Sequence, residues 1–444
     1  RTALFVGSGA DSLLKDALVQ RDHQGFPMIR GSSLTGVLRH ALETEDVGTW
    51  SRFFGYQAEK EGLGSQLKIS SAYLVLEDGR TSEGLSSLGR EHLPKFEDLP
   101  QRQHVRMTHK GVAADGGKFD NEVVNQGCRF LFEMELVGTG GEREKAHWKR
   151  LLDQVHSPLF RLGQGTRNGY GQLSVHSCCE RCFDLKKVED FDAYLNYQPS
   201  FQQTNDCLHL YEFKDSAADD KALQHYRLEL WPDAFFHFGA GYGDEKVDRV
   251  PVREEVVRYE EGSLSFEERS LIPASSIKGA LRHRCCYHYN RLREEEVWAE
   301  EIDDPTPYIG VQNEAVRTLF GAESGGAIED AHQGRVLLND LHPKEMTNDK
   351  IFNHVAIDRF TGGAKDGALF SEKTSQWMGE KPLVIDLWVV HWKQFSSHIQ
   401  DAFEESLKDI CRGLLPLGGM GTKGHGVFQG SLFINDKKHF PDAD

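Results

Sequence analysis

The sequence lacks any apolar run of the roughly eighteen residues that a membrane span requires. Its most apolar late stretch, residues 382–392, is interrupted by Asp386 and His391. A signal-peptide pattern is also missing, and the eight cysteines are mostly unpaired in spacing, which favours the reducing cytoplasm over a secreted scaffold. The chain opens on Arg1 within what reads as part of a strand, so we expect a short N-terminal piece to precede it.

Positive charge is in deficit, because 52 Lys and Arg stand against 69 Asp and Glu, giving a net charge of −17. This balance argues against a protein that holds nucleic acid through its overall field, although it leaves room for a local basic groove. Much of the acid lies in short segments such as 215–220 and 294–301, which we interpret as solvated faces and linkers. With 444 residues and 39% hydrophobic content, the chain is long enough for two or three globular domains.

A Walker motif is absent as well, so nucleotide hydrolysis by a P-loop is not expected. The loop Gly419–Gly424 satisfies G-x-G-x-x-G, but a dinucleotide fold needs a strand before it and a helix after it. Here a predicted helix precedes the loop and an alternating strand follows. Each glycine-rich loop therefore has few side chains and one cation, which is Arg167 in the loop 163–171 and Lys423 in the other. Such a loop lets main-chain amides approach a phosphodiester. A tight turn that needs positive φ is the alternative for either copy alone.

Two segments read as helices whose first turn offers a seat for an anion. In Gly31–Glu43, two serines precede apolar residues at helical spacing, so Ser32 or Ser33 is expected to cap the helix, and Arg39 lies about two turns further in. Residues 274–284 repeat the pattern with Ser275, Ser276, Lys278 and Arg282. Free backbone N–H groups and the positive end of the helix dipole favour phosphate there. An ordinary capped amphipathic helix is the alternative for one such segment alone.

Five landmarks recur in the same order and indicate a duplicated domain. They are a G-x-G opening seven residues before an aspartate (Asp16, Asp248), the seryl helix, a Phe-Gly pair (54–55, 320–321), a His-Val pair leading to an Asp-Gly pair and a phenylalanine (104–119, 354–370), and the glycine-rich loop. Each half reads β-α-β-β-α-β with a long middle insertion. The fold class is therefore predicted as α+β, with two tandem ferredoxin-like (RRM-like) domains that carry thumb-like insertions. We place the domains at 1–176 and 222–444, with a linker at 177–221.

This set of motifs resembles the RAMP superfamily, and residues 358–370 (DRFTGGAKDGALF) are its most telling stretch. Within that family the chain is similar to the backbone subunits of type III CRISPR effector complexes, and its two domains resemble the fused subunits of type III-D-like systems in antiviral defence. The resemblance implies a palm that holds guide RNA (crRNA) by its phosphates, a thumb that kinks the guide–target duplex, and metal-dependent cleavage of target RNA. It also implies other CRISPR effector subunits as partners, and no membrane.

The resemblance places the cleaving aspartate in the loop before the seryl helix, which selects Asp16 and Asp248 as catalytic and metal-binding residues. An RNA 2′-hydroxyl attacks its adjacent phosphate once aligned, while a carboxylate holds Mg²⁺ or Mn²⁺ or takes the proton. Asp11, Asp22 and Asp244 lie nearby and are alternatives, and any single loop aspartate is equally a turn residue. The acidic insertion at 254–268 puts the geometry of Asp248 in question.

Guide binding is expected from residues that face phosphates and so ignore sequence, which base pairing reads instead. These are Ser32, Ser33, Arg39, Arg167, Ser275, Ser276, Lys278, Arg282 and Lys423. In the thumbs, Met107 and Phe360 are candidate wedges between bases, with ordinary hairpin packing as the alternative.

Other signals are weaker. Cys179 and Cys182, with His176 before them and Cys207 and His209 after, form half a zinc pattern, and without a second C-x-x-C we do not expect structural zinc. His104 and His354 are interpreted as hydrogen-bonded core residues.

Two other functions stay open. The chain could be a non-catalytic crRNA-binding scaffold with inert aspartates, or a guide-RNA-processing endoribonuclease, for which only His40 and His283 offer a base near a seryl helix.

Overall fold

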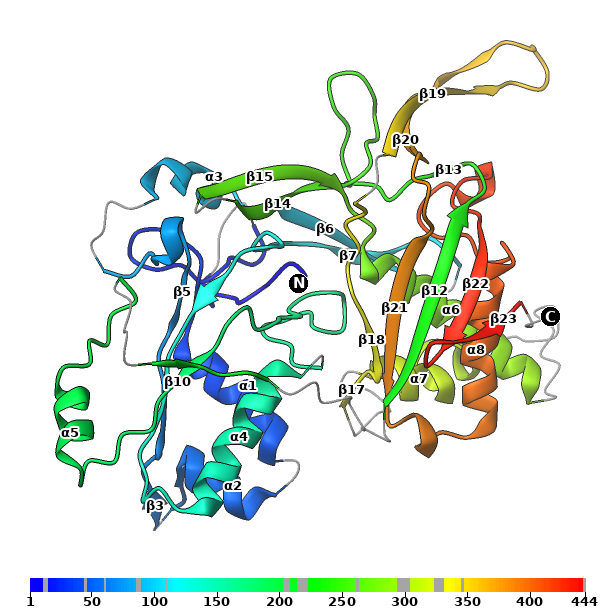
Figure 1. Ribbon diagram of the computed structural model, residues 1–444. Coiled ribbons are helices and arrows are strands. Elements are labelled where there is room, and N and C mark those ends of the chain that lie inside the picture. Colours follow the sequence, from blue (N-terminus) through cyan, green and yellow to red (C-terminus); the bar gives the residue numbers. More distant parts are fainter. Residues whose placement is uncertain are drawn as a thin grey trace.

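The computed structural model describes residues 1–10, 15–43, 46–59, 61–84, 89–108, 110–157, 159–202, 208–213, 223–260, 263–293, 304–322, 331–344 and 347–441. Its α-helices are α1 (Gly31–Glu43), α2 (Val47–Phe54), α3 (Leu93–Glu97), α4 (Glu142–His156), α5 (Val188–Leu195), α6 (Ala274–Leu292), α7 (Glu314–Phe320) and α8 (Ser397–Cys411). Figure 1 shows two lobes, with α1, α2 and α4 in one and α6, α7 and α8 in the other. Among these residues, no helix has the length and apolar character that crossing a membrane demands.

The second half is built on a five-stranded antiparallel sheet. Its strands, in spatial order, are β18 (Val336–Leu338), β21 (Leu383–Val390), β12 (Leu223–Pro232), β22 (Phe428–Ile434) and β23 (Lys437–Phe440). Alternate residues Tyr226, Leu228 and Leu230 of β12 are fully buried, which is the period-two pattern of a strand with one face on a core. That face packs against Ile277 and Leu281 of α6 and against Phe403 of α8.

The first half keeps the chain order but divides its strands among short ladders. These strands are β1 (Met28–Ile29), β2 (Tyr56–Gln57), β3 (Gly62–Leu63), β4 (Leu67–Ile69), β5 (Ala72–Leu74), β8 (Phe130–Leu131) and β9 (Met134–Leu136). They pair as β1-β5-β8, β4-β9 and β2-β3. The last strand of the predicted β-α-β-β-α-β order is not formed in the first half: after the glycine-rich loop, Gln172 makes a single bridge with Arg161, and its N–H donates to the side-chain Oγ1 of Thr2. Two matching ferredoxin-like sheets therefore stay a prediction.

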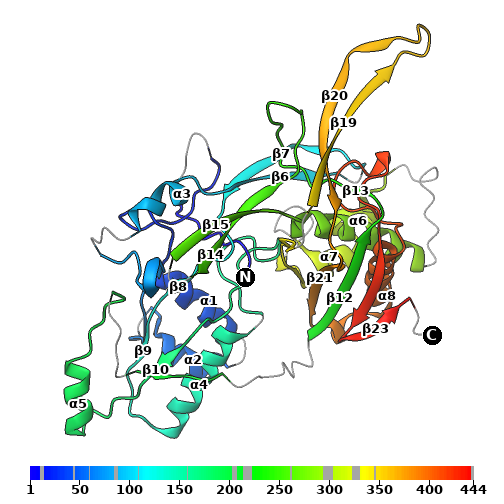
Figure 2. The ribbon, with the colours of Figure 1, turned by 45° about the horizontal axis from the view of Figure 1, so that its top comes forward.

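The two thumb-like insertions are hairpins of the same construction. They are formed by β6 (Gln101–Met107) with β7 (Ala113–Glu122), and by β19 (Thr347–Ile357) with β20 (Ala364–Trp377). His104 pairs with Phe119 and His354 with Phe370, and each hairpin has a bulge two residues further on. In Figure 2 the β19–β20 hairpin projects away from its lobe, whereas β6–β7 runs toward the second half.

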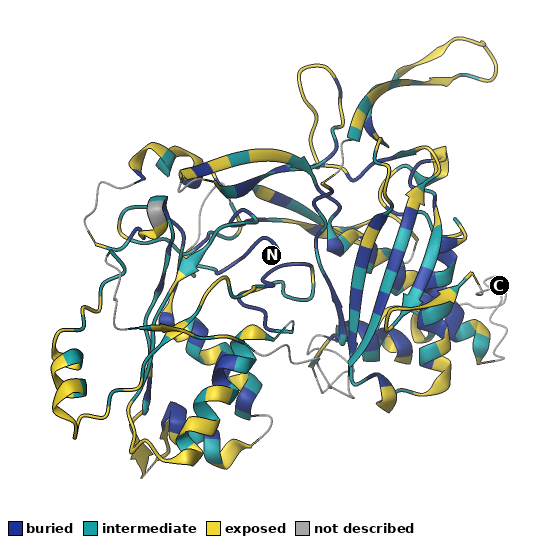
Figure 3. Cartoon of the chain, viewed as in Figure 1, coloured by how far each residue is buried: buried dark blue, intermediate teal, exposed yellow. Residues whose placement is uncertain are grey.

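The acidic insertion at 254–268 is the hairpin β14 (Arg253–Glu260) with β15 (Ser263–Ser270), which reaches back to the first half. Its Val257 and Leu264 belong to the hydrophobic core of that half, and the Val257 N–H donates to Gln126 O at 2.8 Å. The insertion is thus a strap between the lobes rather than a distortion of the Asp248 loop. Figure 3 shows the burial alternating along its strands.

Smaller elements complete the chain. They are β10 (Cys179–Glu180), β11 (His209–Leu210), β13 (Phe235–Phe236), β16 (Gly321–Ala322) and β17 (His332–Gln333). In the predicted linker, α5 has no buried residue.

Candidate nucleic-acid interface

The loops that carry Asp16 and Asp248 are closed in the same way. Gly7 bridges Val19 in the first half, and Gly239 bridges Pro251 in the second, so each loop spans the same number of residues. Each aspartate lies three residues before the closing position and is exposed to solvent. The duplication seen in the sequence therefore extends to the backbone pairing of these loops.

Both carboxylates contact the first strand position after the thumb phenylalanine. Asp16 accepts a hydrogen bond from the Asp120 N–H at 2.9 Å, and Asp248 accepts one from the Ser371 N–H at 2.7 Å and another from the Ser371 hydroxyl. The bonds from Ser371 lower the pKa of the Asp248 carboxyl. Each aspartate thus joins its loop to its thumb while remaining open to solvent.

The alternative aspartates that the structure describes accept hydrogen bonds from backbone N–H groups a few residues further along the chain. Asp22 accepts the N–H groups of Gln24 and Phe26, and Asp244 accepts those of Lys246 and Val247. These are turn-forming contacts, which leave Asp16 and Asp248 as the matched pair. Asp11 lies outside the described residues.

The oxygen atoms beside the two aspartates differ between the halves. In the first half Asp120 adds a second carboxylate, whose Oδ1 accepts the Asp16 N–H at 3.1 Å, whereas the second half offers the Ser371 hydroxyl. Carboxylate oxygens are the ligands that Mg²⁺ and Mn²⁺ prefer, so the first half is the better fit for such an ion.

Elsewhere, Glu77, Glu91 and His92 are the one described group of three side chains that could share an ion. In the cysteine-rich segment, Cys179 and Cys182 are exposed free thiols, and Cys207 falls outside the described residues.

The paired histidines are hydrogen-bonded as expected. His104 Nε2 lies 2.8 Å from Asn121 Oδ1, and His354 Nε2 lies 2.8 Å from Glu372 Oε1. Each ring also stacks on the thumb phenylalanine opposite it. They are positioned as parts of the thumb base.

The serines do not cap their helices as expected. Because α1 already begins at Gly31, Ser32 and Ser33 lie inside its first turn; a Cβ on Gly31 would come within 2.5 Å of Ile69 O. In α6 the Asp340 carboxylate takes the Ala274 N–H at 2.8 Å. Ser32 and Ser276 are exposed and Ser33 and Ser275 are half-buried.

One turn further into each seryl helix, the surface is bare. A Cβ built on Gly36 of α1 or Gly279 of α6 meets no atom within 4 Å. A strand of phosphates could therefore pass close to both helices.

The cations predicted to bind RNA have two kinds of surroundings: some contact residues of their own half, and others lie together where the two halves meet. Arg39 pairs with Glu43 at 2.9 Å, and Lys423 Nζ lies 3.9 Å from the centre of the Phe370 ring. Arg167 instead turns to the second half, where its Nη2 donates to Gln333 Oε1 and its carbonyl accepts Lys278 Nζ at 2.9 Å. Arg282 is half-buried one turn beyond Lys278.

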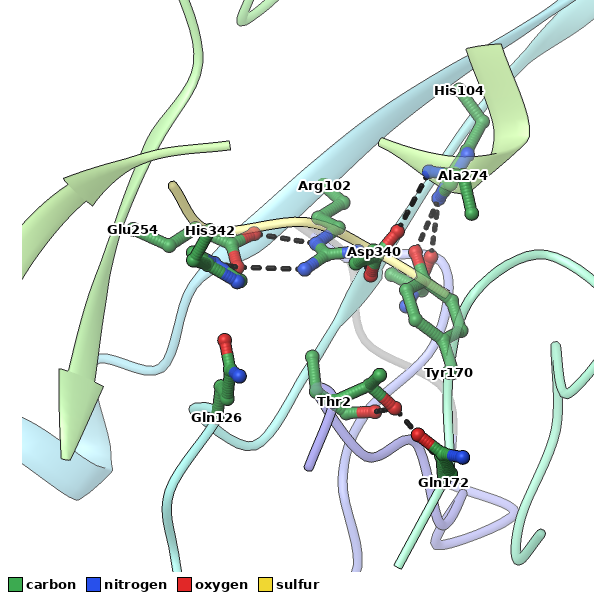
Figure 4. A network of polar contacts seen from close by, with 12 residues as sticks. Thr2, Arg102, His104, Gln126, Tyr170, Gln172, Glu254, Ala274, Asp340 and His342 are labelled. Carbon is green, nitrogen blue, oxygen red and sulfur yellow. Dashed lines mark hydrogen bonds and ion pairs between the residues drawn. The ribbon is translucent and has the colours of Figure 1, made fainter. Parts of the chain in front are cut away.

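A buried ionic network fixes the junction of the halves (Figure 4). Arg102 of β6 donates to Glu254 of β14, with Nη2 to Oε2 at 2.7 Å, and also to Asp340. All three side chains are at most 5% exposed, and His342 lies 3.4 Å from Glu254. No sequence motif predicted this network, because Arg102 lies in the first half and its carboxylate partners lie in the second.

The thumb residues are exposed. Phe360 is 99% exposed at the tip of its hairpin and Met107 is 47% exposed, so hairpin packing does not account for Phe360. By register, however, Met107 pairs with Ala113 as Ile357 pairs with Ala364. The structural counterpart of Met107 is therefore Ile357, and Phe360 lies in the following turn.

These observations define a protein of mixed helices and antiparallel strands with two similarly built halves, each presenting a seryl helix, a glycine-rich loop and an exposed loop aspartate. The chain belongs to the RAMP superfamily, whose family model matches residues 1–174 and 235–429. That superfamily is associated with CRISPR complexes and RNA binding, and the two matched regions indicate a RAMP protein with two domains. A search of curated proteins found no match.

Proposed function

We propose that this chain is a backbone subunit of a type III CRISPR ribonucleoprotein, of the III-D-like kind with two fused ferredoxin-like RAMP domains. It binds crRNA by its phosphates and cleaves complementary target RNA, once per half. The observation that supports this most is the matched pair of exposed aspartates, each held in a loop closed at equivalent positions beside the base of a thumb.

The proposed reaction is attack by a target 2′-hydroxyl on its adjacent phosphorus. The new O–P bond forms as the bond from phosphorus to the 5′-oxygen breaks, and the departing 5′-oxygen takes a proton from water, which leaves a 2′,3′-cyclic phosphate and a 5′-hydroxyl. Asp16 or Asp248 takes the 2′-hydroxyl proton or helps to hold a divalent ion, together with Asp120 in the first half and Ser371 in the second. A bound Mg²⁺ or Mn²⁺ would offset the charge that develops on the phosphate oxygens.

A specific observation also favours the scaffold function. Both carboxylates already accept backbone N–H groups from the thumb strands, so each could serve only to attach its loop to the thumb. In that case the chain holds crRNA but the target is cut elsewhere or not at all.

Cleavage of a labelled target by the assembled complex separates the two functions. Asp16→Ala and Asp248→Ala should each remove one set of fragments, and the double variant should remove both. Asp115→Ala is the matched control. It removes an exposed acid from β7, the thumb strand that also carries Asp120, and should leave every target fragment unchanged. If the double variant binds crRNA and still yields every fragment, the chain is a scaffold.

A further inference from the structure

We infer that the junction between the halves holds one phosphoryl group on a seat shared by Arg161 and Arg167 of the first half and Ser275 and Lys278 of the second. The inference rests on the proposed RNA-binding function and adds to it: one phosphate position belongs to neither half alone and is already assembled in the free chain.

The glycine-rich loop of the first half lies directly against the start of α6. A Cβ on Gly169 would come within 2.6 Å of the Ala274 Cβ, and Lys278 Nζ donates to Arg167 O. Ser275 and Lys278 lie three residues apart on one face of a 19-residue helix. The loop cation, the helix cation and the positive end of the helix dipole therefore converge.

The cations of this cluster have little counter-charge. Burial and then Arg167 lower the pKa of Arg161 to about 10, against an opposite effect of Asp340. Burial and then Arg335 lower the pKa of Arg167 to about 10. Burial, Arg167 and Arg282 lower the pKa of Lys278 to about 8. The nearby carboxylate of Asp340 is taken by Arg102 and the Ala274 N–H.

Two buried donors have no partner. The Nε atoms of Arg161 and Arg167 are both buried without a hydrogen bond, and Arg161 is only 7% exposed. A buried unpaired donor is costly, and a cluster of like charges adds to the cost. A phosphoryl group would supply acceptor oxygens and negative charge at once.

The equivalent residues away from the junction, Arg39 of α1 and Lys423 of the second glycine-rich loop, do not form such a site. In the first half Arg39 is paired with Glu43, and in the second half Lys423 lies on Phe370. The counterpart of Lys423 is Arg167, whose Nη2 donates to Gln333 of β17 and whose carbonyl accepts a hydrogen bond from Lys278 of α6. The junction is therefore the one position, among the residues described, where a glycine-loop cation already meets a seryl helix.

The test measures binding of a fluorescein-labelled single-stranded RNA to the intact chain by anisotropy, with inorganic phosphate in a separate titration. Lys278→Gln and Arg167→Gln should each weaken RNA binding roughly tenfold and reduce the salt dependence by about one phosphate contact. Lys438→Gln, which removes an exposed cation from β23, is the matched control and should change affinity less than about twofold.

Calorimetry provides a second readout. Because an anion favours protonated Lys278, binding at pH 8 should take up a fraction of a proton, and this uptake should shrink at pH 6.5 and vanish in Lys278→Gln. Uptake with RNA identifies the ligand as a backbone phosphate, whereas uptake with inorganic phosphate alone identifies a free ion.

Equal RNA affinity of Lys278→Gln and Lys438→Gln, with no proton uptake, would overturn the shared seat while leaving crRNA binding intact. If neither the chain nor the assembled complex binds RNA, the proposed function itself fails. Thermal unfolding of each variant checks that the junction remains folded.

Discussion

Replacing Arg102 by Met should loosen the junction between the halves by a large and measurable amount. The change keeps an unbranched side chain of similar length but removes the guanidinium group that pairs with both buried carboxylates, Glu254 and Asp340. Removing one partner of a buried ion pair costs about 3–5 kcal/mol. The strap β14–β15 should therefore open about a hundred- to a few thousand-fold more often.

Hydrogen exchange of peptides from β14 measures this opening directly. Arg253→Met is the matched control. Arg253 directly precedes Glu254 in β14, is partly exposed and pairs with Asp349 at 3.0 Å. A pair of that kind contributes at most about 1 kcal/mol, so exchange should rise less than about fivefold. Adding Glu254→Gln and Asp340→Asn to Arg102→Met should recover part of the loss, because the two buried carboxylates are then replaced by neutral amides.

Acid should weaken the same contact. The Glu254 carboxyl has a pKa lowered to about 2, mainly by Arg102 acting against the effect of burial. Its contribution is complete above its ordinary pKa near 4.5 and is lost as pH falls toward 2. The wild-type thermal midpoint should fall in this range more than that of Arg102→Met. Equal exchange in the Arg102 and Arg253 variants would refute the reasoning.

Three further predictions concern the loops, the metal and the thumb. Gly169→Ala, at φ +107 with Asp340 Oδ1 2.4 Å from the new Cβ, should lower the thermal midpoint of the chain more than its counterpart Gly424→Ala, which meets no atom within 4 Å. In Mg²⁺ titrations of target cleavage, the Asp16 site should saturate at lower concentration than the Asp248 site, because Asp120 adds a carboxylate. Phe360→Ala should leave the midpoint unchanged but reduce the fluorescence of 2-aminopurine placed at the kinked base step, since its ring is fully exposed; equal signals would exclude it as a wedge.

The repeated features were predictable because each depends on short local sequence. The equal spacing from the G-x-G opening to Asp16 and to Asp248 predicted two equivalent loops, and the two loops close at equivalent positions. The thumb-like insertions were also predictable from the sequence, although the two Asp-Gly pairs lie inside β7 and β20 and the turns fall earlier, at 108–112 and 358–363.

The failures arose where distant parts of the chain decide the outcome. Serine was expected to cap both helices, but α1 begins one residue earlier, at Gly31, which lies against the Ile69 carbonyl, and Asp340, two residues after β18, caps α6. The insertion that begins at Glu254 was expected to disturb the Asp248 loop, whereas its apolar residues complete the core of the other half. No local pattern encodes contacts between segments that lie so far apart in the sequence.

The most direct test of the account is a structure of the assembled complex with crRNA and target RNA. The account predicts that one continuous guide backbone passes the starts of α1 and α6, with a phosphate at the junction and a displaced target nucleotide beside each of Asp16 and Asp248. A guide strand that runs along a different face, with both aspartates far from any RNA, would contradict it.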